Sequence, residues 1–205
     1  MPKIKKLNLT RIMAVAVLLI SLVDSYVLLK HEHFSQLFWF CNSVIYLLAI
    51  GLYFRNSMML TGVFTGAMVV QIPWVLDFLL RLFFGYSLFG ITSYMFDYGF
   101  DNIRFYLELD HLLIIPLSIY GIKKTGFHKK GWVFASVVAL AINTGAYLFS
   151  STADNVNCVF YSCFSDKIIA NAHPLAYMLG WTFLLCILFY VFNKIIYKTL
   201  NRKRK

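Results

Sequence analysis

Six apolar runs alternate with short polar segments along this chain. A helix needs roughly 20 apolar residues to cross the hydrocarbon core of a bilayer, and each run is close to that length or longer. The runs cover residues 12–29, 34–54, 58–84, 105–122, 132–149 and 174–196. Strands of a membrane β-barrel alternate polar and apolar residues over about ten positions, and this alternation is missing from the sequence. The pattern therefore predicts an all-α, polytopic membrane protein with a six-transmembrane-helix bundle.

Prolines and segment lengths refine these predicted helices. Pro73 falls inside the long third run, where its missing N–H predicts a kink or a split. Pro116 predicts a kink in the fourth run, whereas Pro174 opens the sixth run, at a helix position that tolerates proline well. The first run exceeds the apolar core of about 7–15 residues that a cleaved signal peptide has, so we expect it to be retained as a helix.

The overall composition agrees with a membrane protein. Of the 205 residues, 60% are hydrophobic and only 14% are charged, whereas soluble domains are about 45–50% apolar and about 25% charged. No low-complexity segment or internal repeat divides the chain. We therefore expect a single integral membrane domain over residues 1–205.

The basic residues predict an orientation in the membrane. When six spans are threaded with the N-terminus in the cytoplasm, 15 of the 19 basic residues fall on the cytoplasmic side. The other four are Lys30, Arg81, Arg104 and Lys167. Cytoplasmic segments of membrane proteins carry such an excess of Lys and Arg, so both termini are predicted to be cytoplasmic. The net charge of +10 then indicates contact with lipid headgroups rather than with nucleic acid.

Polar side chains recur at a similar depth below the outer ends of five of the six runs. His111 lies six residues into the fourth run, roughly 9 Å deep at 1.5 Å per residue. The corresponding residues of the other runs are Asp24, Cys41 with Asn42, Asp77 and Asn143. A charged side chain at this depth costs at least a few kcal/mol, so such residues usually face the bundle interior. This layer predicts one polar cavity that opens outward; unrelated interhelical hydrogen bonds are the alternative.

Cys41 and His111 are the pair in this layer that can support catalysis. A nucleophile needs a base within hydrogen-bonding reach, and a neighbouring acid, Asp110 or Asp77, can hold the imidazole in one tautomer. Trp39 and Trp74 would then line the path of an acyl chain. The alternative for Cys41 is a packing role, because cysteine in a helix often acts as a small apolar residue.

The loop before the last run contains two of the four cysteines, and this loop is predicted to lie outside the cytoplasm. Cys158 and Cys163 would face an environment that favours oxidation, so they form either a disulfide or two free thiols. Polar loop residues such as Asp154, Asn155 and Asn157 can cover the predicted cavity, because loops over pockets often carry function.

Three short motifs resemble one known family. They are FWFCNS around Cys41, ELDHLL around His111 and DNVNCVF before Tyr161. This layout, over roughly residues 34–161, resembles the transmembrane-protein-164-like membrane family, which is related to the androgen-induced-gene type of intramembrane lipid hydrolases. The resemblance implies hydrolysis or transfer of a lipid acyl group, with Cys41 as nucleophile and His111 as base. The chain has Trp39 and Leu112 where the family often has His and Gly.

Three classes of function stay open on the sequence alone. A lipid acyl hydrolase or acyltransferase needs Cys41, and a small ion- or proton-coupled carrier needs the carboxylates of Asp24, Asp77 and Asp110. A non-catalytic membrane subunit needs neither set. We expect no metal or other cofactor, and the predicted partners are membrane lipids.

Overall fold

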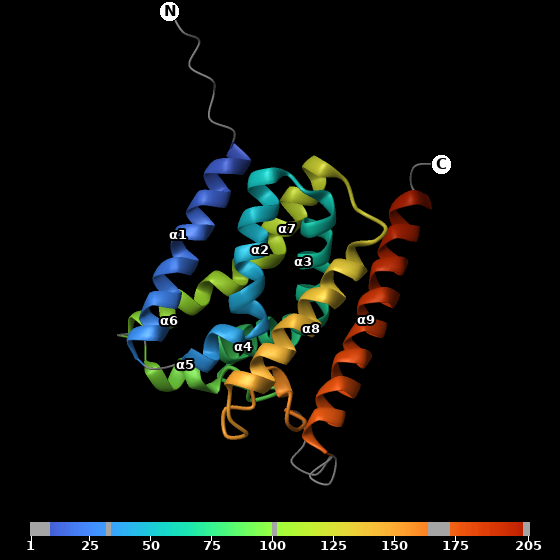
Figure 1. The fold of residues 1–205 in the computed structure, drawn as a ribbon. Helices are drawn as coiled ribbons and strands as arrows, with labels where there is room; N and C mark the ends of the chain where they lie inside the picture. Colours follow the sequence, from blue (N-terminus) through green and yellow to red (C-terminus); the bar gives the residue numbers. More distant parts are fainter. Residues whose placement is uncertain (1–8, 32–33, 100–101, 164–172, 203–205) are drawn as a thin grey trace, which may run out of the picture.

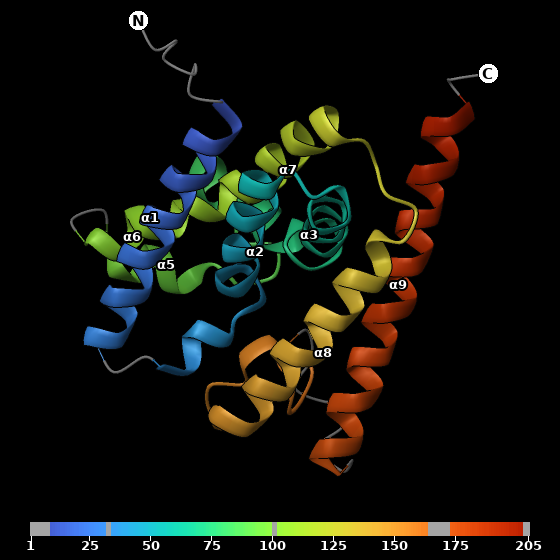
Figure 2. The ribbon, with the colours of Figure 1, turned by 45° about the horizontal axis from the view of Figure 1, so that its top comes forward.

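The protein is a bundle of long helices that run alternately up and down (Figure 1). The computed structural model describes residues 9–31, 34–99, 102–163 and 173–202. The bundle consists of α1 (Leu9–Lys30), α2 (Phe40–Phe54), α3 (Ser57–Val70), α7 (His111–Thr125), α8 (Gly131–Phe149) and α9 (Pro174–Arg202). Figures 1 and 2 both show α1 beside α2 and α8 beside α9, and these pairs are in contact.

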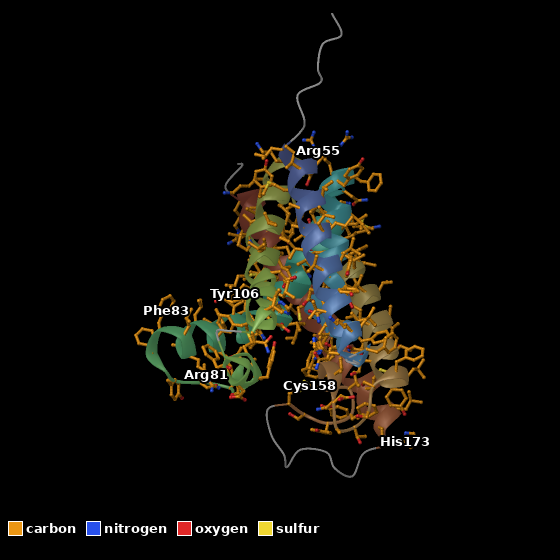
Figure 3. The ribbon with its side chains drawn as sticks, turned by 90° about the vertical axis from the view of Figure 1, so that its left-hand side faces the viewer. Arg55, Arg81, Phe83, Tyr106, Cys158 and His173 are labelled. Atoms are coloured by element: carbon orange, nitrogen blue, oxygen red, sulfur yellow. A yellow bond between two sulfur atoms is a disulfide. The ribbon has the colours of Figure 1, made fainter. Side chains whose placement is uncertain are left out.

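The two ends of the bundle differ in charge. The start of α1, the turn at Arg55, the α7–α8 loop and the end of α9 lie together (Figure 1). We call this the basic end, because it holds most of the described Lys and Arg residues. The opposite end carries Cys158 and His173 (Figure 3) and is called the pocket end. The basic residues at positions 3, 5, 6, 167 and 203–205, which were also assigned a side of the membrane, lie outside the described residues.

Helix α3 is the centre of the bundle. Every residue from Leu60 to Ala67 is buried, and α3 packs on α2, α7 and α8. Two glycines permit this packing, because a Cβ on Gly62 would lie 2.5 Å from the Phe134 ring and one on Gly66 would lie 2.5 Å from the Phe40 ring. Small residues of this kind let helix backbones approach closely within a membrane.

The long third run divides into two helices with different directions. Helix α4 (Ile72–Phe84) is bent by 56° from α3. The break is local in origin: Pro73, in the first turn of α4, has no N–H to continue the α3 ladder. Gln71 joins the two helices, because its N–H donates to the Ala67 carbonyl and its own carbonyl accepts from the Val75 N–H.

Helix α4, the loop 85–92 and α5 (Ser93–Tyr98) form a unit that projects sideways from the pocket end, and we call residues 72–98 the wing (Figure 3). The buried carboxylate of Asp77 holds the loop of the wing together. It accepts hydrogen bonds from the Phe89 N–H (2.7 Å) and the Thr92 N–H (2.9 Å), as well as from both Ser87 and Thr92 hydroxyls. After the wing, α6 (Ile103–Leu107) and the turn η2 (Glu108–Asp110) lead into α7.

The helices are those of a polytopic membrane protein. Among the described residues, four segments are long and apolar enough to cross a bilayer alone: α1, residues 105–125, α8 and α9. The bent pair α3–α4 passes the same test only as a unit. Helix α2 has 15 residues, about 22 Å at 1.5 Å per residue, and is preceded by the short turn η1 (Phe34–Phe38). The six spans and their orientation stay predictions, and α7 is continuous through Pro116.

Candidate functional site

A cavity of about 570 Å³ lies at the pocket end. Small-molecule sites in proteins usually have volumes of about 300–1,000 Å³. The start of α2, the end of α3, the wing, the α7 entrance, α8, the loop 154–163 and α9 all contribute side chains. Val69, Val70, Trp181 and Leu185 give it apolar walls, and its polar lining residues include Cys41, Glu108 and His111.

The start of α2 places Cys41 in this cavity. Cys41 is the second residue of the helix, where the free N–H groups of the first turn favour negative charge on a nearby sulfur. Asn157 holds the backbone on both sides of Trp39: it accepts from the Phe40 N–H (2.8 Å) and donates to the Phe38 carbonyl (2.7 Å). The loop after α8 therefore fixes the position of the thiol.

His111 reaches the cavity of Cys41 from the start of α7. The two side chains line the same cavity and interact electrostatically. The imidazole Nδ1 lies 2.7 Å from Asp110 Oδ1, and Nε2 lies 3.6 Å from Glu108 Oε2. Because Asp110 occupies Nδ1, Nε2 is the nitrogen of this imidazole that is left to act as a base. The Trp74 ring stacks on the imidazole with centroids 4.9 Å apart, and Gln71 donates to the His111 carbonyl.

A second polar network joins the wing to this pair. Tyr94 donates to Glu108 Oε2 (3.1 Å) and Trp74 Nε1 donates to the Tyr94 oxygen (3.3 Å). Desolvation and the nearby Glu108 carboxylate raise the pKa of Tyr94 well above its ordinary value. The hydroxyl therefore stays protonated at neutral pH and acts as a donor to Glu108, which in turn lies beside His111.

The loop after α8 closes one side of the cavity with a disulfide. Cys158 and Cys163 are bonded, and both line the cavity. Asn155, Asn157 and Cys158 have positive φ values of 39°, 54° and 59°. Asparagine adopts the left-handed region more readily than most residues, which explains why two asparagines stand here. From the sequence, a disulfide and two free thiols were alternatives; the structure has the disulfide.

The predicted site residues divide into those that line the cavity and those that do not. The lining ones are Trp39, Cys41, Asn42, Trp74, His111 and Asn143. Asn42 donates to the Gln36 carbonyl (2.9 Å) and Asn143 donates to the Thr182 hydroxyl (2.9 Å), so both amides also join neighbouring segments. Asp110 does not line the cavity, but its carboxylate is hydrogen-bonded to His111, which does.

Two predicted cavity residues are corrected by the structure. Asp77 is fully buried but does not line the cavity, because the wing loop surrounds its carboxylate with donors. Asp24 is buried on α1, and α1 contributes no residue to the cavity. Equal depth along separate helices therefore did not mean one shared site for these two carboxylates.

Several functional candidates were missed by the sequence analysis. Glu108 precedes His111 by three positions, a spacing that puts two side chains on one face of a helix, so this signal was available. Gln71 stands one turn before Trp74 in the same polar layer, whereas Tyr94 had no signal, and the contacts of both with the site depend on the bend between α3 and α4. Among the described residues, no group of three His, Cys, Asp or Glu side chains is placed to hold a metal ion.

Comparison with models of known protein families, with curated proteins and with solved structures found no match. The family resemblance therefore stays a prediction from three short motifs.

Proposed function

We propose that this membrane protein is an enzyme that hydrolyses or transfers a lipid acyl group, with Cys41 as the nucleophile and His111 as the base. The observation that carries the proposal is that both side chains line one largely apolar cavity, with Asp110 hydrogen-bonded to Nδ1 of the imidazole. A nucleophile, a base and a group that orients the base are the three roles of acyl-transfer triads.

The chemistry follows from this arrangement. His111 Nε2 takes the thiol proton while the Cys41 sulfur attacks the ester carbonyl of a lipid. The carbon–oxygen bond then breaks, and the imidazolium returns the proton to the alcohol that leaves, which gives an acyl-thioester on Cys41. Water or the hydroxyl of a second lipid attacks the thioester, again with His111 as base, and restores the thiol.

The walls of the cavity favour a lipid over a water-soluble acyl donor. Val69, Val70 and Leu185 line it from two helices, and Trp39, Trp74 and Trp181 add large apolar surfaces. Apolar walls with a few convergent polar groups are typical of sites for apolar ligands. An acyl chain can therefore lie along the walls while its ester reaches Cys41.

Two of the three carboxylates that an ion- or proton-coupled carrier would need are already paired with other groups. Asp77 accepts hydrogen bonds from the wing loop, and Asp110 pairs with His111 at 2.7 Å. A carboxylate that coordinates a transported ion or relays protons needs to face an ion pathway, and neither of these lines the cavity.

The test is covalent capture of the acyl-enzyme. Purified protein in proteoliposomes is incubated with a phospholipid that carries an alkyne-tagged acyl chain, and the labelled residue is identified by mass spectrometry. We expect a hydroxylamine-sensitive label on Cys41 and its loss in Cys41→Ala. The matched control is Cys186→Ala, because Cys186 is the other free cysteine and is also half-buried; this variant should keep the label.

Two further variants separate the roles of nucleophile and base. His111→Ala should reduce the rate of labelling by about 10²–10⁴-fold, the usual contribution of a general base. Cys41→Ser should turn over little, because a hydroxyl is a weaker nucleophile than a thiol beside the same base. Unchanged turnover of lipid by Cys41→Ala would refute the proposal.

A further inference from the structure

The wing carries an apolar surface that the bundle does not cover. On α4, the side chains of Leu76, Phe83 and Phe84 are 46%, 71% and 78% exposed. Leu76 and Phe83 are seven positions apart and so share one face, and Phe84 follows Phe83 at the exposed end of the helix, whereas Asp77 and Phe78 are the buried residues of the same helix. The loop 85–92 continues the exposed surface with Tyr86, Leu88 and Phe89.

The wing is too short to use this surface as a membrane span. Helix α4 has 13 residues, about 20 Å at 1.5 Å per residue, and a hydrocarbon core is about 30 Å thick. Its 56° bend from α3 takes it further from the direction of a span. The surface of the wing therefore lies beside the bundle at the level of the pocket end, as Figure 3 shows.

The two edges of the wing have opposite character. In Figure 3, Phe83 lies at the edge nearer to Arg55 and the basic end, and Arg81 lies at the opposite edge. The Arg81 guanidinium donates to the Ser93 hydroxyl and lies 4.0 Å from Asp97, whose side chain is 72% exposed. Phe83 thus lies on the side of the wing that faces the basic end, and Arg81 lies on the side that faces away from it.

We propose that the wing lies in the interface of the leaflet at the pocket end, with Leu76, Phe83 and Phe84 against lipid acyl chains. Helices of this kind lie in the membrane plane with the apolar face roughly 5–10 Å below the headgroups. The lipid occupant is favoured by continuity with the bundle, since α6 contacts both α5 of the wing and α1. Exposed apolar side chains follow this route, at Ile103 and Tyr106 on α6 and at Leu22 and Val23 on α1. The exposed surface of the wing therefore continues an exposed apolar surface of the bundle.

This placement sets the level at which the cavity meets the membrane. Pro73, Trp74, Ile91 and Tyr94 belong to the wing and line the cavity. One side of the cavity therefore lies at headgroup level, so that a lipid can reach the cavity without leaving its leaflet. The position of the wing is independent of the proposed chemistry and can be tested without any measurement of activity.

Spin labels on single cysteines test the position of the wing. The background carries Cys41→Ser and Cys186→Ser and keeps the Cys158–Cys163 disulfide. Labels at Phe83→Cys and Phe84→Cys are compared in proteoliposomes with a lipid control, Val137→Cys, and a water control, Asp97→Cys. Leu76→Cys repeats the measurement two turns earlier on the same face. All the apolar positions are exposed, so these substitutions remove no core packing.

Accessibility of each label to oxygen and to a water-soluble nickel chelate gives the result. We expect oxygen to dominate at positions 83 and 84, at a depth shallower than at 137, and nickel to dominate at 97. Nickel accessibility at 83 and 84 equal to that at 97 would place the wing in water and overturn the proposal. Protection from both reagents would overturn it as well, in favour of a protein occupant, and dipolar broadening between labels would identify that occupant as a second copy of this chain.

Discussion

Helices α3 and α4 come from one continuous apolar run, yet they end in opposite surroundings. From Leu60 to Ala67, α3 is buried without a break and has helices on several sides. In α4 only Asp77 and Phe78 are buried, and Phe84 is 78% exposed. Apolar composition therefore indicates that a segment belongs to a membrane protein, but not whether the segment is buried in the bundle or exposed beside it.

The buried residues of the two helices also stabilise the fold in different ways. In α3 the close approach of neighbours depends on having no side chain at Gly62 and Gly66. In α4 the fold of the wing depends on one carboxylate, because Asp77 accepts the hydrogen bonds of the loop that follows. Substitutions can therefore separate packing in the bundle from hydrogen bonding in the wing.

The largest effect is expected at Asp77. Asp77→Ala removes the acceptor of the Phe89 and Thr92 N–H groups, and each buried group left unpaired costs about 1–3 kcal/mol. The loop 85–92 should become sensitive to limited proteolysis while the bundle keeps its helical circular dichroism. Asp77→Asn keeps one acceptor oxygen and should lie between Asp77→Ala and wild type. A loop equally resistant in Asp77→Ala would show that the carboxylate is dispensable.

The next effect should appear in α3 at Gly62. A Cβ there would lie 2.9 Å from Phe134 Cβ and 3.0 Å from the Gly131 carbonyl oxygen. Overpacking of this kind costs about 1–3 kcal/mol, so Gly62→Ala should lower the free energy of unfolding in mixed micelles. Gly180→Ala is the matched control, because no atom lies within 4 Å of that position and alanine favours the helix at both sites. Equal behaviour of the two variants would contradict the close packing of α3.

A smaller effect is expected where α4 ends. Gly85 caps the helix with φ 67° and has open space around it. Gly85→Ala should therefore destabilise the wing through the backbone alone, by about 1–2 kcal/mol, the cost of a left-handed conformation for a residue with a Cβ. Proteolysis of the loop 85–92 should increase less than in Asp77→Ala. Unfolding of the whole bundle in this variant would contradict the expectation that the wing can be destabilised while the bundle stays folded.

The smallest effect on folding is expected on the exposed face of the wing. Phe84→Ser removes no buried contact, and surface substitutions usually change stability by no more than about 0.5 kcal/mol. Thermal unfolding in detergent should match wild type within that range. A large loss of stability would indicate that Phe84 packs against protein, which would also count against a lipid-facing wing.

The helices themselves could be predicted because their signals are local. Run lengths predicted α1, α8 and the start of α9 closely, and Pro73 predicted the break in the third run. The site could be predicted only in part. Cys41 and His111 were recognised as rare polar residues at similar depth, and both line the cavity. Depth alone failed for Asp24 and Asp77, because it does not specify which way a helix face turns.

By itself, the sequence determined the apolar helices and gathered most basic residues at one end of them, since hydrophobic length and charge act within each segment. Only the tertiary structure decided that α4 leaves the bundle, that Asp77 serves the wing, and that Glu108 and Tyr94 join His111. These outcomes depend on contacts between segments far apart in the chain. A buried polar group takes whichever partners the packing of those segments brings within hydrogen-bonding distance.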